Sequence, residues 1–166
     1  MSRIAGLHSY NRNLDLASLL KSQEPQSPPP PRSLRTMETE TARLGFTGAS
    51  SSSTAQEGDI AVAMDGTIYN SEEFEREGDA EIILELYRKY GFTETLRKLN
   101  GDFALALLDA RSGETWLARD RFGIKPLYHA RFADGFAFAS RCKPLLQLPG
   151  IINRPNHLFL ALFAAS

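Results

Sequence analysis

The sequence predicts an α+β fold, in which antiparallel strands and helices occupy separate parts of the chain. Three pairs of β-rich runs are each divided by a glycine-containing turn signal, at Asp65-Gly66, Ser112-Gly113 and Asp134-Gly135. Between the first two pairs, apolar residues recur at helical spacing. Hairpins with helices segregated from them favour an α+β fold over a doubly wound parallel sheet.

Length and composition narrow the classes of protein to consider. The 166 residues suit one domain with a hydrophobic core, and 19 Lys+Arg against 20 Asp+Glu argue against a general affinity for nucleic acid or acidic membranes. The apolar runs are far shorter than the roughly 20 residues that span a bilayer. Cys142 has no second cysteine with which to form a disulfide. We therefore expect a cytoplasmic protein without nucleic-acid or membrane partners.

In the first third of the chain we expect two flexible loops. Residues 22–36 contain a run of prolines, which neither donate backbone hydrogen bonds nor continue a helix. Residues 47–58 are rich in serine and have almost nothing to bury.

From residue 59 onward, strands and helices are predicted in order. Asp59 to Met64 should form a strand that turns at Asp65-Gly66 and returns along Thr67 to Tyr69. Ser71 is expected to cap a short acidic helix that ends at Gly78. Asp79 should cap a second helix, and a third should run from near Thr93 to Asn100. The apolar stripe of the second helix consists of Ile82, Ile83, Leu86, Tyr87 and Tyr90.

Two further hairpins follow. Phe103 to Ala110 pairs with Glu114 to Arg119, and the first of these runs is apolar on both faces, so it should be buried on both sides. Leu127 to Phe132 pairs with Phe136 to Ser140. The segment from His157 to Ala165 is a short apolar helix or an unpaired strand, and Cys142 should be a buried or partly buried thiol near a strand end.

Most familiar catalytic motifs are missing. The chain has no glycine-rich phosphate loop, GxSxG, HExxH or CxxC motif, and its three histidines have no metal-ligand spacing, so no metal site is predicted. The run Arg119 to Arg121 should be an ion-paired corner that holds the loop to Gly123. Ser2 would become N-terminal after removal of Met1, and its α-amine could then act as the base for its own hydroxyl. On the residues alone, an ordinary second residue is the plainer interpretation.

Several longer runs carry a family resemblance. They are residues 2–7 (SRIAGL), 65–70 (DGTIYN), 78–81 (GDAE), 99–104 (LNGDFA), 117–128 (LARDRFGIKPLY), 138–141 (FASR) and 144–146 (PLL). On these runs the sequence resembles the N-terminal class II glutamine amidotransferase domain of glutamine-hydrolysing asparagine synthetases. The match is close over residues 59–150, and the run at 117–128 is its most specific part.

The resemblance implies an N-terminal-nucleophile hydrolase fold, a four-layer αββα sandwich of two antiparallel sheets between helices. Family members hydrolyse glutamine through a thioester on an N-terminal cysteine and pass the ammonia to a second domain that adenylates aspartate with ATP. Residues 1–150 would then form the amidotransferase-like domain and residues 151–166 a tail, with the start of a synthetase half as an interpretation of that tail. No cofactor is expected in this chain, because ATP and magnesium belong to the synthetase domain.

The resemblance also assigns candidate site residues. Ser2 stands at the nucleophile, and Asp65 and Gly66 stand at the oxyanion hole. Of the candidate glutamine-binding residues, Thr67 and Asp79 stand where the family holds the amino group, and Arg43 stands where it grips the α-carboxylate. Two of these residues have alternative interpretations: Asp79 as a helix N-cap, and Arg43 as an outward-facing cation.

Four of the matched positions depart from the family pattern. Ser2 replaces cysteine, Asp65 replaces asparagine, Thr67 replaces glutamate, and Arg3 replaces glycine.

Three hypotheses about the function remain. The chain is a module with impaired or lost glutaminase activity that binds glutamine or supports a synthetase domain or subunit, or an active amidohydrolase that uses Ser2, or a fragment of an asparagine-synthetase-like protein.

Overall fold

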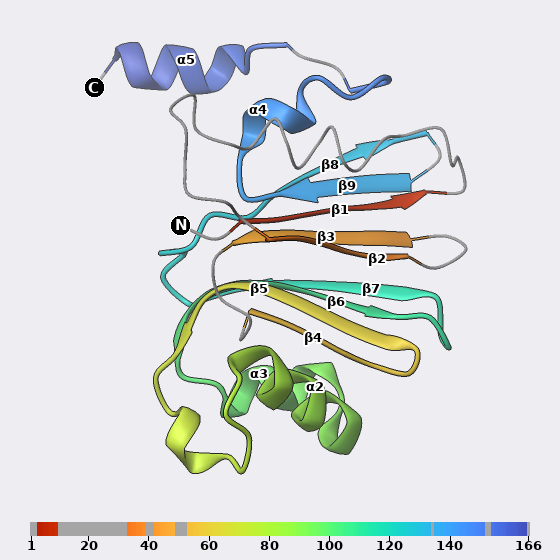
Figure 1. The fold of residues 1–166 in the computed structure, drawn as a ribbon. Helices are drawn as coiled ribbons and strands as arrows, with labels where there is room; N and C mark the ends of the chain where they lie inside the picture. Colours follow the sequence, from red (N-terminus) through yellow and green to blue (C-terminus); the bar gives the residue numbers. More distant parts are fainter. Residues whose placement is uncertain are drawn as a thin grey trace.

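The computed structural model describes residues 3–9, 33–38, 42–48, 53–133, 135–151 and 154–165, which form two antiparallel sheets facing each other (Figure 1). The strands of the five-stranded sheet are, in spatial order, β2 (Ser33–Glu38), β3 (Ala42–Gly48), β1 (Arg3–Ser9), β9 (Gly135–Ala139) and β8 (Tyr128–Phe132). Those of the four-stranded sheet are β4 (Thr54–Glu57), β5 (Ile60–Ile68), β6 (Gly101–Asp109) and β7 (Glu114–Arg119).

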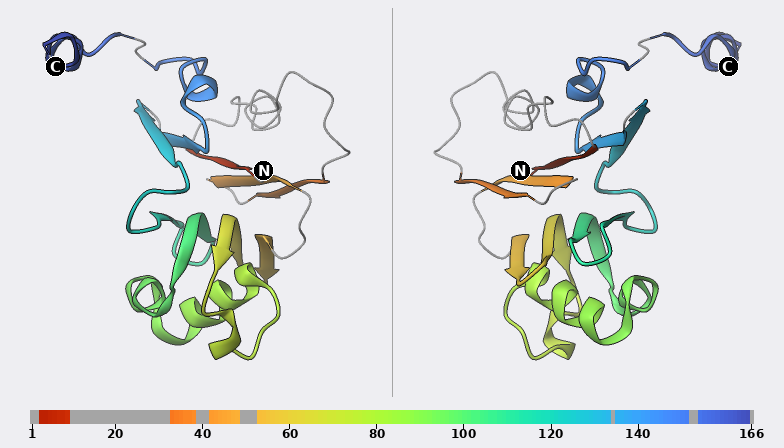
Figure 2. Two further views of the ribbon diagram at one scale, coloured as in Figure 1. Left: turned by 90° about the vertical axis from the view of Figure 1, so that its left-hand side faces the viewer. Right: turned by 90° about the vertical axis from the view of Figure 1, so that its right-hand side faces the viewer.

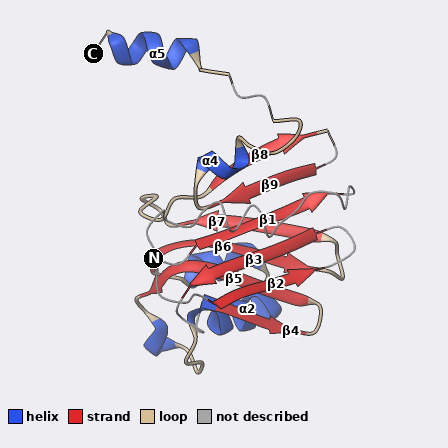
Figure 3. Cartoon of the chain, turned by 45° about the horizontal axis from the view of Figure 1, so that its top comes forward, coloured by secondary structure: helices blue, strands red, loops and turns tan. Residues whose placement is uncertain are grey.

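Helices lie outside the two sheets. The helices α2 (Asp79–Tyr90) and α3 (Phe92–Lys98) cover the outer face of the four-stranded sheet, and the short α4 (Cys142–Leu145) packs on β8 and β9 (Figures 1 and 2). The helix α5 (His157–Ala164) stands away from the sandwich (Figure 3). The predicted α+β sandwich of two antiparallel sheets is therefore confirmed.

Complementary side-chain sizes hold the two sheets together. The inner face of the four-stranded sheet presents mainly alanines, and the facing sheet fills the space with large side chains. The alanines are Ala61, Ala63, Ala104 and Ala106, and the large residues are Ile4, Leu44, Phe46 and Phe138. Small residues on one face let the sheets approach closely while the large ones keep the interior densely packed.

The outer face of the four-stranded sheet carries the second core. Along β5, Val62 and Met64 point away from the other sheet, and they pack with Leu105 and Leu107 of β6 beneath the helices. The helices contribute Ile83 and the partly buried Tyr87 of the predicted stripe, together with Leu84 and Phe92, which were not part of it. Residues 103–109 of β6 are buried throughout, so the prediction that this strand is covered on both faces is confirmed.

The first predicted hairpin is wrong. The strand β5 runs through Asp65-Gly66 without turning, and it pairs with β6 so that Asp65 lies opposite Ala104 and Gly66 opposite Phe103. Gly66 has φ +144°, and a Cβ added there would lie 2.0 Å from the Asp102 carbonyl oxygen. This glycine therefore serves a close approach between two backbones, not a chain reversal.

Helix starts also differ from the prediction. The segment after Ser71 forms only a single 3₁₀ turn, η2 (Ser71–Glu73). Gly78 is the N-cap of α2, and Asp79 is the first helical residue and makes no side-chain capping bond. The helix α3 begins at Phe92 and ends at Lys98, close to its predicted bounds.

The remaining predictions divide between confirmed and corrected. The hairpins β6–β7 and β8–β9 are confirmed. Residues 33–36 belong to β2 and residues 54–57 to β4, where loops were predicted. The rest of the Pro-rich loop, residues 22–32, lies outside the described residues. Cys142 is exposed, contrary to prediction, because it begins α4 at the surface.

The C-terminal segment, one of whose two predicted forms was a helix, is the helix α5. Its large apolar residues are all exposed, and they are Leu158, Phe159, Leu160, Leu162 and Phe163. In the described part of the chain, none of the helices is both long and apolar enough to cross a membrane.

Replacing Gly66 with alanine is expected to destabilise the protein by more than about 3 kcal/mol, because the new Cβ would collide with the backbone of β6. Gly58 provides the control, since it also has a positive φ, +57°, but nothing lies within 4 Å of its missing Cβ. Gly58→Ala should cost only about 1 kcal/mol. Urea unfolding of both variants measures the difference, and equal losses would contradict the close-approach role of Gly66.

Candidate functional site

Four segments that are distant in sequence meet at one end of the sandwich and form a cleft of about 600 Å³. They are the start of β1, the later part of β5, the segment that leads from β7 into the start of β8, and the segment that leads from β9 into α4. The cleft is lined by Arg3, Asp65, Ile124, Lys125, Pro126, Tyr128, Ser140, Arg141, Cys142 and Lys143. Of the predicted site residues that the structure describes, Asp65 alone is in this lining.

The Asp65 carboxylate is the central charged group of the cleft. The residue is 7% exposed, and the Lys125 ammonium donates to its Oδ1 at 3.5 Å. Burial raises the pKa of the Asp65 carboxyl, and the positive charges of Lys125 and Arg3 only partly oppose that shift. A carboxylate in this position carries a desolvation cost that its neighbours do not fully offset.

Lys125 reaches Asp65 because a second carboxylate shapes its loop. Asp120 is 5% exposed, and its oxygens accept the backbone N–H groups of Phe122, Ile124 and Lys125 at 2.9–3.0 Å. Although burial opposes the shift, these N–H groups hold the pKa of Asp120 below its ordinary value. The corner at residues 119–121 was predicted to be ion-paired; it is instead held by a carboxylate that binds backbone.

The start of β1 is fixed by the end of β9. The Ile4 N–H donates to Ser140 Oγ at 3.0 Å, and the Ser140 N–H donates to the Ile4 carbonyl at 2.9 Å. The Ser140 hydroxyl also donates to that carbonyl at 3.3 Å. This reciprocal clamp holds the backbone beside Arg3 at the cleft wall. Ser2, the predicted nucleophile, lies outside the described residues.

The other predicted site residues occupy two places. Gly66 and the exposed Thr67 directly follow Asp65 on β5. The Asp79 carboxylate accepts the Ile68 backbone N–H, and burial raises its pKa despite that bond. Asp79 therefore lies beside the end of β5, whereas Arg43 lies on β3 opposite Leu7 and does not line the cleft. The substrate roles of all these residues stay predictions.

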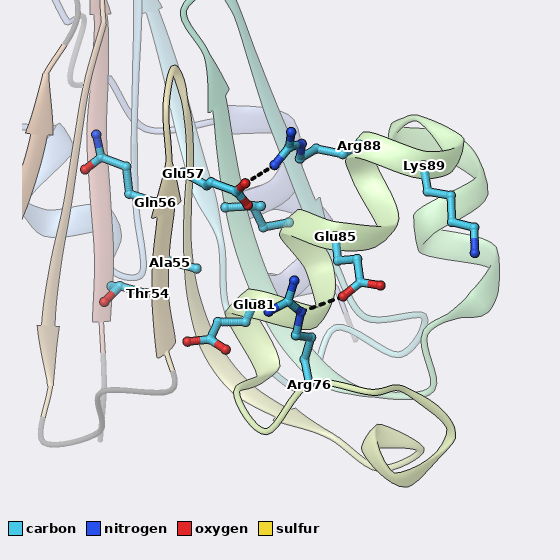
Figure 4. A pocket seen from close by; sticks show the side chains of 10 residues that line it. Thr54, Ala55, Gln56, Glu57, Arg76, Glu81, Glu85, Arg88 and Lys89 are labelled. Atoms are coloured by element: carbon cyan, nitrogen blue, oxygen red, sulfur yellow. Dashed lines mark hydrogen bonds and ion pairs between the residues drawn. The ribbon is translucent and has the colours of Figure 1, made fainter.

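A second cleft, of about 650 Å³, lies between β4 and α2 on the helical side of the molecule (Figure 4). Arg88 of α2 pairs with Glu57 of β4, and Arg76 pairs with Glu85 at 2.7 Å. None of the predicted site residues within the described ranges lines it, and its charged groups largely neutralise one another. We therefore place the candidate site in the Asp65 cleft.

Sequence reasoning missed several residues of the candidate site. Lys125, Arg141 and Ser140 belong to runs that carry the family resemblance, but no role followed from those runs. Lys143 had no signal at all, because it reaches the cleft only through the fold. Among the described residues, no group of three His, Cys, Asp or Glu side chains could hold a metal ion. The expectation that this chain needs no cofactor stays a prediction.

Comparison with known proteins adds evidence that is independent of the geometry. The sequence model of a glutamine amidotransferase domain family matches residues 46–147. Human asparagine synthetase (glutamine-hydrolysing) is 40% identical over 92 residues, which are 50% of this chain and 16% of that protein. A Methanocaldococcus jannaschii protein, provisionally assigned as a second asparagine synthetase of this type, is 35% identical over 106 residues, 59% of this chain and 20% of that protein. The chain thus spans no more than a fifth of these relatives.

A solved structure supports the fold alone. The glutamine phosphoribosylpyrophosphate amidotransferase of B. subtilis superimposes with a TM-score of 0.56 and 14% identity, over 86% of this chain and 36% of that one. At this identity the likeness concerns the arrangement of strands and helices.

The burial of Asp65 leads to a pH-dependent prediction. Because the pKa is raised in the folded protein, the folded chain binds this proton more tightly than the unfolded chain does. The folded state is therefore destabilised as the pH rises above 3.8, the ordinary pKa of an aspartate. Asp65→Asn should therefore raise the free energy of unfolding at pH 7 by about 1 kcal/mol, and the gain should shrink toward pH 4. Urea unfolding at the two pH values measures this; the exposed Asp59→Asn is the control. A less stable Asp65→Asn protein at pH 7 would contradict it.

Asp120→Asn tests the loop that presents Lys125. The change keeps the size of the side chain but removes a charge that accepts three backbone bonds, so we expect a loss of about 2 kcal/mol. Trypsin cleavage within residues 121–125 should also accelerate. Arg121→Ala, at an exposed position of the same loop, should change stability by less than about 0.5 kcal/mol. The two changes are compared by stability alone, because Arg121→Ala removes the trypsin site itself. Equal losses of stability would show that the carboxylate does not organise the loop.

Proposed function

The chain belongs to the family of glutamine amidotransferase domains, of the type found in asparagine synthetases, and from this premise we propose that its own glutaminase activity is impaired or lost. We propose that the domain acts instead as a structural or partner-binding module for a synthetase domain or subunit. Three features support this proposal: the charge of Asp65, the chemistry of Ser2, and the exposed apolar residues of α5.

The observation that carries the proposal is the buried carboxylate of Asp65. Hydrolysis of an amide passes through a tetrahedral oxyanion, which needs hydrogen-bond donors aimed at it in a site from which water is excluded. The resemblance assigns this task to position 65, where an ionised carboxylate has no proton to donate and adds a negative charge. Losing one such donor costs roughly 10²–10³ in rate, before any repulsion.

The assigned nucleophile weakens the reaction further. A serine hydroxyl is far harder to ionise than a cysteine thiol, whose pKa is about 8.5, so Ser2 would depend almost wholly on a base for activation. Thr67 also lacks the carboxylate that would hold the amino group of glutamine. Binding and chemistry are thus both weakened at the positions that the resemblance assigns.

A partner for this domain is proposed from the helix α5. Leu158 is 71% exposed and Phe163 is 73% exposed. Covering such apolar side chains with a second surface is favourable, because it removes them from water. The family relationship makes a synthetase domain, on this or another polypeptide, the partner that we propose.

We propose the cytoplasm as the location, since the single cysteine, Cys142, is exposed and free.

An active amidohydrolase is the second candidate function, and the Ser140 clamp favours it. The hydrogen bonds that join the backbone N–H and carbonyl of Ile4 to Ser140 hold the beginning of β1 beside the cleft, as an N-terminal nucleophile would need. In that case Ser2, exposed by removal of Met1, would attack an amide. Intact mass tests this alternative, because retention of Met1 blocks the α-amine that the mechanism requires.

Ammonia release from glutamine tests the main proposal. The unmodified chain should be at least about 100-fold slower than a Ser2→Cys, Asp65→Asn double variant, because the second change restores an N–H donor. The single Asp65→Asn variant isolates the contribution of the donor from that of the thiol. If the unmodified chain releases ammonia as fast as the double variant, the proposed loss of activity is wrong.

A further inference from the structure

The Asp65 cleft has a charge pattern that the proposed loss of glutaminase activity does not explain. Among the described lining residues, four cationic side chains outnumber the single carboxylate, that of Asp65. The cations are Arg3, Lys125, Arg141 and Lys143. They come from three separate segments of the chain, so the excess is not a property of one basic run.

Burial makes this excess consequential. Arg3 is only 6% exposed, and the Lys125 side chain is 31% exposed, so both charges are held partly out of water. Asp65 engages Lys125 at 3.5 Å. Among the described lining residues there is no second carboxylate to pair with Arg141 and Lys143, which lie at the exposed side of the cleft. Cations gathered in a partly desolvated concavity favour an anionic ligand.

The lining of the cleft also has an apolar part. Ile124 is 59% exposed and Tyr128 is 45% exposed, and Pro126 lies between them in the sequence. These side chains leave apolar surface in contact with water beside the cationic groups, and a ligand could cover it. The volume of about 600 Å³ lies within the range typical of small-molecule sites.

We propose that this cleft binds a small organic anion with an apolar body and no ammonium group. The inference deepens the proposed function, because it concerns the cleft that contains Asp65 and rests on the proposed loss of glutamine hydrolysis there. A cationic surround repels the ammonium group of a free amino acid and attracts a carboxylate. The ligand's charged end would face Arg141 and Lys143, and its apolar part would contact Ile124 and Tyr128.

Matched ligands test the proposal with the whole chain at low salt. Calorimetric titration with hexanoate should show saturable binding that weakens as sodium chloride is added. The zwitterion 6-aminohexanoate should bind at least about threefold more weakly, and hexylamine should not bind. Inorganic phosphate, an anion without an apolar body, should also bind more weakly than hexanoate. Phosphate binding as tight as hexanoate binding would overturn the apolar part of the proposal.

Variants locate the binding in the cleft. Arg141→Ala with Lys143→Ala should weaken hexanoate binding about tenfold. The control, Arg97→Ala with Lys98→Ala, removes the same charge from α3, outside the cleft, and should leave the affinity unchanged. Equal effects of the two pairs, or no saturable hexanoate binding by the unmodified chain, would overturn the proposal.

Ammonia release from glutamine, measured on the same samples, separates the two proposals. Rapid release together with hexanoate binding at the cleft would refute the loss of glutaminase activity and support the anion site. Slow release without hexanoate binding would support the loss of activity and refute the anion site.

Discussion

A carboxylate buried at the side of a sheet has to be compensated by neighbouring positive charge, and Asp65 imposes this constraint on the whole cleft. Lys125 meets part of it at 3.5 Å, and it can do so only because Asp120 folds residues 121–125 around its own oxygens. Arg3 adds a second, nearly buried cation at the start of β1. The loop, the strand end and the charge excess of the cleft are therefore linked through one side chain.

The sandwich itself does not depend on that side chain. Near Asp65, the strand β5 is held by its backbone hydrogen bonds to β6. It also needs a glycine at position 66, where the Asp102 carbonyl leaves no space for a Cβ. The inner core depends on the alanines of the four-stranded sheet and the large residues that face them. Fold and site are thus separable in this chain, so the amidotransferase architecture does not by itself establish amidotransferase chemistry.

The same separation explains what the sequence could predict. The turn at Ser112-Gly113 and the helical stripe of α2 follow from local chemistry. The turn was predicted correctly, and so was the stripe except for Tyr90, which is exposed. Asp65-Gly66 also resembles a turn in its local sequence. The glycine is needed there because the neighbouring strand approaches closely at Asp102, 36 positions away, and no local pattern reveals that contact. Asp120 likewise looks like part of an ion pair, whereas its partners are backbone N–H groups that exist only once the loop is folded. Lys143 joins the cleft only through the packing of α4.

The charge of the cleft also bears on whether its cations could serve as the oxyanion donor that, on the proposed function, position 65 lacks. The Lys125 ammonium has three protons to donate, and in the structure one of them points to Asp65. A transient oxyanion would have to compete for the Lys125 ammonium with the Asp65 carboxylate, which already pairs with it. Replacing Asp65 with a neutral residue would free Lys125 from this ion pair. A bound external anion would pair with the other cations of the cleft. On the proposed function, the cleft therefore stabilises a lasting negative charge in place of the short-lived one that hydrolysis requires.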